Sequence, residues 1–560
     1  MEYVHEPIRA PRLHGRTLRA FVRLLENPLT AALLAPSLIH SLGVSKLRTA
    51  AIDEAPTPSL SHDHRGSGTG TDVLPVTPVR RHPIRTIRDY ADAFTQGLAT
   101  PEGVAERFLH AVAASDQNLP PLRAFIACNR EDILLQARAS TARHRAGKAL
   151  GLLDGVPVAV KDELDMKPYP TTVGTRFLGN VVARQDATVV QRLRDAGALL
   201  VGKTNMHEIG ILPSGINPHF GTVRNPYNLA HNSGGSSSGS AAAVAAGLCP
   251  GAVGADGGGS IRIPASFCGV VGLKPTYGRI SEFGAAPLCW SVAHVGPIGA
   301  TVHDAALLYA AMAGRDAADP NTLGQPPVSF ERYDGALRGI RLGVYRDWFN
   351  DADAEVVATC ERLVEALVRL GAEIVEIVIP DLNMISVAFG LTILTEMAAS
   401  MSIHEAEHLC DFGWTTREML AIVRNTRPSD YVIAQRVRTR ALRNFLSALD
   451  KVSAIVTPAT ALTAPRIEER SLPDGESDVD QTMRTMRFAA VANFTGLPAI
   501  SVPAGYDSRG LPIGLQLICR PWEEGLLLRI AYAADTIVQR SRPATYYDML
   551  PESRAGDEER

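Results

Sequence analysis

The sequence predicts an α/β protein in which a mainly parallel β-sheet is covered by helices on both faces. Two segments, residues 186–201 and 352–379, repeat one order: a helix with one apolar face, a glycine and a buried strand. A third apolar run, residues 155–160, indicates a further buried strand. Helices that feed apolar strands through short glycine loops are typical of parallel sheets covered on both faces.

Each helix–strand segment is supported by its own periodicity. In the first, Val189, Val190 and Leu193 share one helical face, and an apolar strand follows. In the second, apolar residues recur at helical spacing until Gly371, which precedes the strand at 373–379. Apolar spacing of three to four residues predicts a helix, and a glycine just beyond it marks the end.

Composition limits the class of protein. With 560 residues, 46% of them hydrophobic, the chain can bury a large core. A net charge of −3 gives no general electrostatic case for a nucleic-acid partner. The seven cysteines are scattered without a Cys-x-x-Cys pair, which favours a reducing compartment and argues against a zinc site. No apolar run reaches the roughly 20 residues that span a bilayer. We therefore expect a cytoplasmic protein without metal or cofactor.

The first 53 residues form a distinct arm. Its basic residues are Arg9, Arg12, Arg16, Arg19 and Arg23, and its opposite apolar face is Leu18, Phe21, Val22 and Leu25. Pro11 and Gly15 limit this helix to about residue 16 onward, and Pro36 breaks the apolar segment that follows. A basic amphipathic helix before an apolar hairpin indicates peripheral contact with a membrane. Packing on the body of the protein or on a second subunit explains the same pattern, and both interpretations stand.

The chain divides into four parts: a helical arm (residues 1–53), a flexible linker (54–83), a catalytic domain (84–545) and a C-terminal tail (546–560). The linker is rich in Pro, Ser, Gly, Thr and His and has few large apolar residues. Such a segment cannot bury enough surface to offset its ordering entropy.

A lysine and two serine–glycine runs suggest the chemistry. Lys161 ends the apolar run 155–160, where a cation is poorly hydrated, and Ser236 and Ser260 lie in two glycine-rich turns further along the chain. A serine hydroxyl is a poor nucleophile until a base takes its proton, and burial disfavours the charged form of a lysine. These are the parts of an acyl-transfer site that uses no histidine, and they predict a hydrolase.

Residues 235–239 also fit the Gly-x-Ser-x-Gly turn of α/β-hydrolases. That interpretation needs a later histidine and an upstream oxyanion loop. Histidines are available downstream, but the upstream loop is missing and Ser260 would have no role. His207-Glu208 could be read as a metal pair, but no second histidine follows at the helical spacing of zinc sites, so we expect a structural role.

These residues resemble the amidase signature family, whose hallmark is a Lys, cis-Ser, Ser triad within a Gly/Ser-rich segment. The matching segments are 160–162, 202–208, 234–281, 456–458 and 496–503. The resemblance covers roughly residues 85–540. It implies a mixed, mainly parallel sheet of about eleven strands with helices on both faces.

The resemblance also implies residue roles. Ser260 would be the nucleophile, Ser236 the bridging serine on a cis peptide, and Lys161 the base. The amides of Gly257, Gly258, Gly259 and Ser260 would stabilise the oxyanion, and Asp256 and Arg262 would support the loop. One departure is Ala255, where the family commonly has threonine, so a supporting hydroxyl is missing there.

A narrower resemblance is to the plant-type fatty acid amide hydrolases. It rests on residues 10–15, 21–22, 24–29, 348–351, 520–522 and 547–550. It implies hydrolysis of linear amides, above all long-chain fatty acid amides such as N-acylethanolamines, by a homodimer. It does not transfer the residues of the acyl pocket.

Three alternatives remain at this stage. The same chemistry could act on small aryl or aliphatic amides. The chain could be a glutamine-dependent component resembling glutamyl-tRNA amidotransferase A, which acts with a partner. A non-enzymatic membrane scaffold would require the triad to be vestigial.

Overall fold

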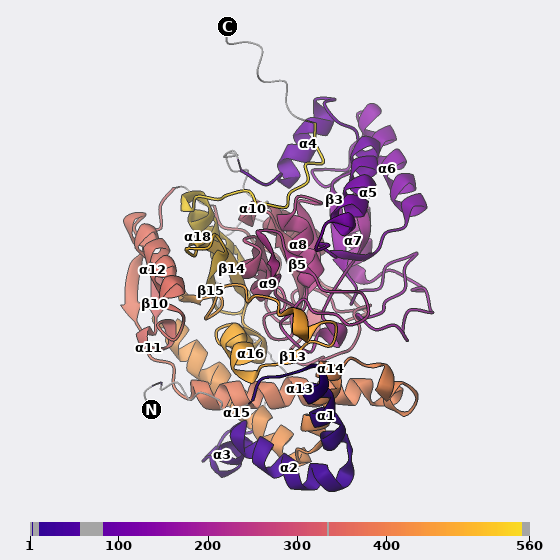
Figure 1. Ribbon diagram of the computed structural model, residues 1–560. Coiled ribbons are helices and arrows are strands. Elements are labelled where there is room, and N and C mark those ends of the chain that lie inside the picture. The colour runs from indigo at the N-terminus through magenta and orange to yellow at the C-terminus, as the bar shows by residue number, and fades with distance from the viewer. Residues whose placement is uncertain (1–2, 4–10, 57–81, 333–334, 552–560) are drawn as a thin grey trace.

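The computed structural model describes residues 3, 11–56, 82–332 and 335–551. Its centre is one mixed sheet of eleven strands with helices on both sides (Figure 1). In spatial order the strands are β11 (Glu373–Glu376), β10 (Arg341–Val344), β12 (Ala454–Pro458), β15 (Pro512–Ile518), β14 (Ala499–Tyr506), β8 (Val271–Lys274), β9 (Val295–Gly299), β7 (Gly251–Ala255), β3 (Pro157–Lys161), β4 (Leu199–Thr204) and β2 (Phe125–Ala127). The predicted α/β class, the mixed sheet with helices on both faces and the number of strands are confirmed.

The expectation of a mainly parallel sheet is wrong. Four pairings are parallel, β11–β10, β10–β12, β7–β3 and β3–β4, and the other six are antiparallel. The two helix–strand segments found in the sequence do enter parallel pairs, because each helix carries the chain back across the sheet. The middle strands need no such crossover; β14 and β15, for example, form a hairpin.

The helices of the body cover both faces and one end of the sheet. They are α4 (Ile87–Thr95), α5 (Pro101–Gln117), α6 (Arg130–Arg145), α7 (Thr188–Asp195), α8 (Ser238–Ala245), α9 (Arg262–Phe267), α10 (Val302–Met312), α11 (Arg346–Phe349), α12 (Ala354–Arg369), α13 (Leu382–His408), α14 (Trp414–Arg424), α15 (Pro428–Leu449), α16 (Val479–Met486), α17 (Ala490–Thr495) and α18 (Glu524–Ile537). In Figure 1, α13 and α15 lie below the sheet, and the N-terminal helices lie below them. Two short pairs complete the strands, β1 (Leu13–His14) with β13 (Glu476–Ser477) and β5 (Arg224–Asn225) with β6 (Asn228–Asn232).

The arm forms three helices, α1 (Gly15–Glu26), α2 (Pro28–Ser41) and α3 (Val44–Thr49). Its predicted apolar face is buried, since α1 packs on α14 and α3 packs on α13 and α15. Packing on the body, one of the two interpretations of the arm, is therefore present within this chain. The expected break at Pro36 is wrong, because α2 continues through it. Arg9 lies outside the described residues.

The boundaries of the linker and the tail shift. Glu54 pairs with Arg440 at 2.8 Å and with Arg443 at 2.5 Å, so the arm remains attached to α15 beyond residue 53. Residues 57–81 of the expected linker lie outside the described residues. Residues 546–550 pack on the body, with Met549 and Leu550 in the core, so the tail begins later than expected.

Helix α13 with its following turn is one helical segment that the sequence patterns did not predict. Among the described residues it alone is long and apolar enough to cross a membrane by length and composition. It packs against α14, α15 and α17. A helix that is buried in the core of a protein can also be long and apolar, so this packing accounts for the apolar composition of α13.

Candidate active site

Lys161 lies at the end of β3, at the edge where β3 and its parallel neighbour β7 finish. Its side chain is 1% exposed. The Nζ atom is 2.9 Å from Ser236 Oγ, 3.0 Å from the Ala255 carbonyl oxygen and 2.7 Å from a Glu163 carboxylate oxygen. The amine is thus dry and in direct contact with the first of the two predicted serines.

The two serine turns meet beside this lysine. Ser236 precedes α8, Ser260 precedes α9, and the Ser237 N–H donates to the Ser260 carbonyl oxygen at 3.2 Å. The Gly235–Ser236 peptide is cis. A Cβ on Gly235 would lie 2.2 Å from the Ser214 oxygen, so only glycine allows this approach.

The glycine loop after β7 is shaped by close contacts. A Cβ on Gly258 would lie 2.6 Å from the Phe389 ring and 2.8 Å from Met486, so a side chain there would displace these two residues of the cavity wall. The Gly259 N–H donates to Asp256 at 2.6 Å. Because that donor is used inside the loop, the expected oxyanion donors narrow to the amides of Gly257, Gly258 and Ser260.

Arg262 and Asp256 support the loop from below. Both are fully buried, and the guanidinium donates to Asp256 at 3.0 and 3.1 Å. Arg262 also donates to Gln516 and Asn493, and Asn493 donates to the Asp256 carbonyl. Burial alone would raise the pKa of Asp256, but the Arg262 charge and these bonds outweigh it and hold that pKa well below its usual range. The carboxylate stays ionised and the loop stays fixed.

Ser237 holds the backbone of Ala255, the position at which the family commonly has threonine. Its Oγ donates to the Ala255 carbonyl oxygen at 3.1 Å and accepts from the Ala255 N–H at 3.3 Å. The same carbonyl oxygen accepts from Lys161. The backbone at residue 255 is therefore bound from a neighbouring turn.

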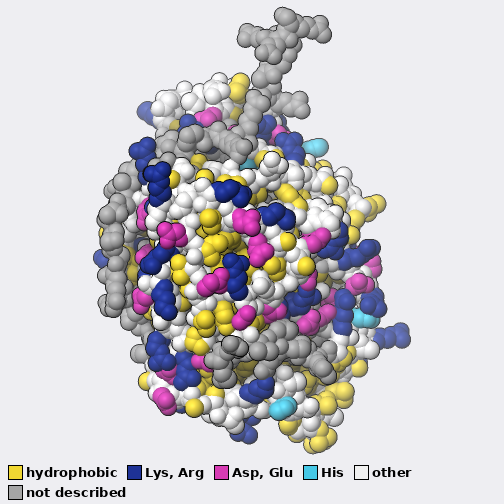
Figure 2. All heavy atoms as spheres, turned by 90° about the vertical axis from the view of Figure 1, so that its left-hand side faces the viewer, with side chains coloured by type: hydrophobic (Ala, Val, Ile, Leu, Met, Phe, Trp, Pro, Cys, Tyr) yellow, Lys and Arg dark blue, Asp and Glu magenta, His cyan; other side chains and the backbone are white. Residues whose placement is uncertain are grey.

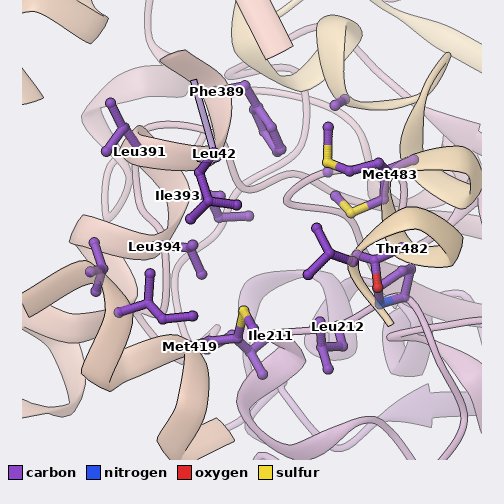
Figure 3. Close-up of a pocket in the computed structure, with 18 of the residues that line it drawn as sticks. Leu42, Ile211, Leu212, Phe389, Leu391, Ile393, Leu394, Met419, Thr482 and Met483 are labelled. Carbon is purple, nitrogen blue, oxygen red and sulfur yellow. The ribbon is translucent and has the colours of Figure 1, made fainter. Parts of the chain in front are cut away.

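A cavity of about 210 Å³ opens beside Ser260. Figure 3 shows its apolar side chains converging from α13, α14, α16 and the segment after residue 210. Those labelled are Leu42, Ile211, Leu212, Phe389, Leu391, Ile393, Leu394, Met419, Thr482 and Met483. Ile39, Leu42 and Val44 of the arm also line it. The site therefore places Ser260 in the wall of a mostly apolar pocket.

The residues behind the other interpretations of the sequence find structural partners. Burial lowers the pKa of His207 to about 4, and its Nδ1 lies 3.1 Å from Ser214 Oγ. Glu208 contacts His219 at 2.6 Å and accepts from the Gly413 N–H. Among the downstream histidines, His294 Nδ1 lies against the Val292 carbonyl. In the Gly-x-Ser-x-Gly interpretation the nucleophile would be Ser237, but its Oγ donates to the Ala255 carbonyl oxygen and accepts from the Ala255 N–H. The amine of Lys161 lies next to Ser236 Oγ, as the lysine interpretation expects.

Several residues of the site were missed from the sequence. Glu163, Ser237, Asn493 and Gln516 all contact predicted site residues. Glu163 lies in the turn after β3, where the side chains no longer alternate as they do in a strand, so no periodic pattern placed it beside Lys161. Asn493 and Gln516 come from distant segments, and no local pattern marks them.

The fold and this arrangement define an enzyme that cleaves amide C–N bonds. A family model described as amidase matches residues 104–528, and the chain belongs to that family. It is 39% identical to a fatty acid amide hydrolase of Medicago truncatula over 98% of this chain and 97% of that protein. It is 34% identical to the A-type component of the glutamyl-tRNA(Gln) amidotransferase of Koribacter versatilis, over 79% of this chain and 96% of that one. Among solved structures it is similar to a bacterial aryl acylamidase, with TM-score 0.73 and 27% identity over 83% of this chain and 98% of that chain.

Proposed function

We propose that the chain is a serine amidase that hydrolyses long-chain fatty acid amides, such as N-acylethanolamines, through an acyl-enzyme on Ser260. The observation that carries the proposal is the apolar cavity that begins at Ser260. An acyl chain is uniformly apolar, and each methylene it buries contributes about 0.8 kcal/mol. The similarity to a plant fatty acid amide hydrolase over almost the whole chain supports the same substrate class.

The proposed reaction uses three side chains in line. Neutral Lys161 takes a proton from Ser236, and Ser236 takes a proton from Ser260. At the same time the Ser260 oxygen attacks the amide carbon. The loop amides stabilise the tetrahedral oxyanion, one such donor being worth roughly 3–4 kcal/mol. Ser236 then delivers a proton to the departing amine and is reprotonated by Lys161. Water attacks the acyl-enzyme by the same route and releases the fatty acid.

We also propose that α2 contacts a lipid surface. This helix is mostly apolar, yet only Ala31, Ala35 and Ile39 are buried, while Leu29 and Leu33 are each 80% exposed. Hydrophobic side chains lie at the lower edge of Figure 2, the end at which Figure 1 places the arm. Exposed leucines beside each other on one helix favour contact with an apolar surface. Because Ile39, Leu42 and Val44 line the cavity, a lipid at this face would lie close to the acyl pocket.

The test is a chain-length series of acyl ethanolamides with the purified protein. The expected result is a kcat/KM that rises about fourfold per methylene, from ~0.8 kcal/mol each, until the cavity is filled. Ser260→Ala is the control for background hydrolysis. A flat series, with good turnover of short anilides, would instead assign the small-amide activity that the aryl acylamidase suggests. Glutaminase activity that appears only with an added partner would favour the amidotransferase class.

A further inference from the structure

We propose that Glu163 is a positioning residue that orients Lys161 and sets the pH range over which Lys161 can act as the base. The inference rests on the proposed function only in taking Lys161 as the base of the Ser260 nucleophile. It is independent of which amide is the natural substrate.

The contacts of the amine give the orientation. Its three neighbours are the Glu163 carboxylate at 2.7 Å, Ser236 Oγ at 2.9 Å and the Ala255 carbonyl at 3.0 Å. The Glu163 carboxylate and the Ala255 carbonyl can only accept from nitrogen, whereas Ser236 can donate or accept. A neutral amine has two N–H groups and one lone pair. When those two groups bind Glu163 and Ala255, the lone pair faces Ser236, as proton abstraction requires.

The charge of Glu163 acts in the same step. As Lys161 takes the proton from Ser236, the ammonium forms beside a carboxylate that is only 5% exposed. An opposite charge in a dry site favours formation of the ammonium, so it assists proton abstraction. Removing that charge should weaken the base and move the acid limb of the activity to lower pH.

Other ionisable groups lie around the Lys161–Glu163 pair. Among the described residues, Glu163 is the one whose carboxylate contacts the Lys161 amine. Glu282 and Cys289 come from the segment between β8 and β9, Glu396 from α13 and Lys274 from β8. Burial, followed by Asp319 and Glu163, raises the pKa of Glu282, and burial raises the pKa of Cys289. These two groups therefore favour their neutral forms beside the pair.

The adjacent charges are paired elsewhere. Asp162 turns to the other side of the strand, where it meets Lys203 at 3.1 Å. Asp256, next to the Ala255 carbonyl, is bound by Arg262. Glu163 is thus the carboxylate whose removal should be felt by Lys161.

The test is the pH dependence of Ser260 labelling by a fluorophosphonate probe, which requires no natural substrate. In Glu163→Gln, which keeps an acceptor but loses the charge, the acid limb should move to lower pH. The plateau rate should also fall. In Glu163→Asp, the charge remains but the carboxylate is withdrawn, so the plateau should fall while the acid limb stays. Asp165→Asn, which removes a nearby charge that binds Thr171, is the matched control and should leave the limb in place.

An acid limb shared by wild type and Glu163→Gln would overturn the proposal. If Glu163→Gln does not fold, Glu163→Asp decides: a reduced rate with an unmoved limb supports it, and a wild-type rate overturns it. If the acid limb moves in Glu163→Gln but the wild-type protein does not hydrolyse long-chain amides, the role of Glu163 stands and the substrate proposal is wrong. If Lys161→Ala is labelled at the wild-type rate, both the assignment of Lys161 as the base and the role of Glu163 are wrong.

Discussion

At the scale of single residues, the burial of Lys161 is the feature on which the proposed chemistry depends. An isolated buried ammonium is very costly, so a buried lysine is either paired or neutral. Lys161 has a carboxylate, a hydroxyl and a carbonyl within 3.0 Å, so both protonation states have partners. An amine with hydrogen-bond partners in both its protonated and its neutral form suits a base that must gain and lose a proton in every cycle.

Lys161→Ala should therefore abolish most of the activity without unfolding the protein. Loss of a general base ordinarily costs about 10²- to 10⁴-fold in rate. The measurement is the rate of fluorophosphonate labelling of Ser260, with circular dichroism to confirm folding. Lys148→Ala, at an exposed position, is the control and should label as wild type does. Similar rates for the two variants would show that Lys161 is not the base.

Local motifs predicted Lys161, Ser236 and Ser260 because each lies on a glycine turn or strand end with a recognisable sequence. The structure brings Lys161 and Ser236 into contact and joins the two serine turns through one backbone bond. The catalytic roles remain predictions. Asn493 and Gln516 were not predictable, since they reach Arg262 from more than 220 residues away.

At the scale of elements, the arm has two faces with different tasks. The buried side of α1 is fixed by Arg417, which binds Glu26 at 2.6 Å and stacks on Trp414, and by Arg19, which binds Asp474. The outer side of α2 keeps leucines in solvent. The arginine periodicity identified the helix, but part of that basic face binds the body, so the sequence could not separate the docking face from the face proposed to contact a membrane.

Leu29→Asp with Leu33→Asp should weaken binding to anionic phospholipid vesicles while leaving hydrolysis of a soluble anilide unchanged. Both positions are exposed, so their replacement removes apolar contact without disturbing the core. Leu135→Asp, an exposed leucine on α6 at the far end of the molecule in Figure 1, is the matched control. Co-sedimentation with vesicles gives the binding. Unchanged vesicle binding combined with loss of a dimer in sedimentation would assign this face to a second copy of the chain.

The central sheet also shows which features the sequence could predict and which it could not. The sequence pattern located β3, β4 and β11 and the helices that precede β4 and β11, and the family resemblance matched segments that overlap β12 and β14. Pairing direction depends on how connections cross the sheet, and periodicity carries no information about that for the middle strands. The strand number came from the family resemblance rather than from spacing.

At the scale of the whole molecule, buried carboxyl groups couple its stability to pH. Burial raises the pKa of Asp304 to about 7, although its bonds to Thr301 and to the Ile87 N–H act in the opposite direction. Burial likewise raises the pKa of Glu418 to about 7, and its hydrogen bond from Ser477 only partly offsets this. Glu418 lies at the cavity wall, where α14 meets β13, the strand that pairs with the arm. Its ionisation would therefore loosen the arm, the pocket and the body together.

Glu418→Gln should make the protein more stable at alkaline pH. The folded-state pKa of about 7 lies above the ordinary value of 4.5, so the folded protein favours the protonated form. The stability that Glu418 contributes is complete below pH 4.5 and is lost as pH rises through 7. At pH 8 that loss amounts to about 3 kcal/mol, which glutamine avoids because it stays neutral and can still accept from Ser477.

Thermal unfolding from pH 4 to pH 8 is the measurement, with exposed Glu407→Gln as the control. We expect equal midpoints for Glu418→Gln and wild type at pH 4 and a higher midpoint for Glu418→Gln at pH 8. A variant that tracks wild type at every pH would place the Glu418 carboxylate in contact with water and separate it from the packing of the pocket.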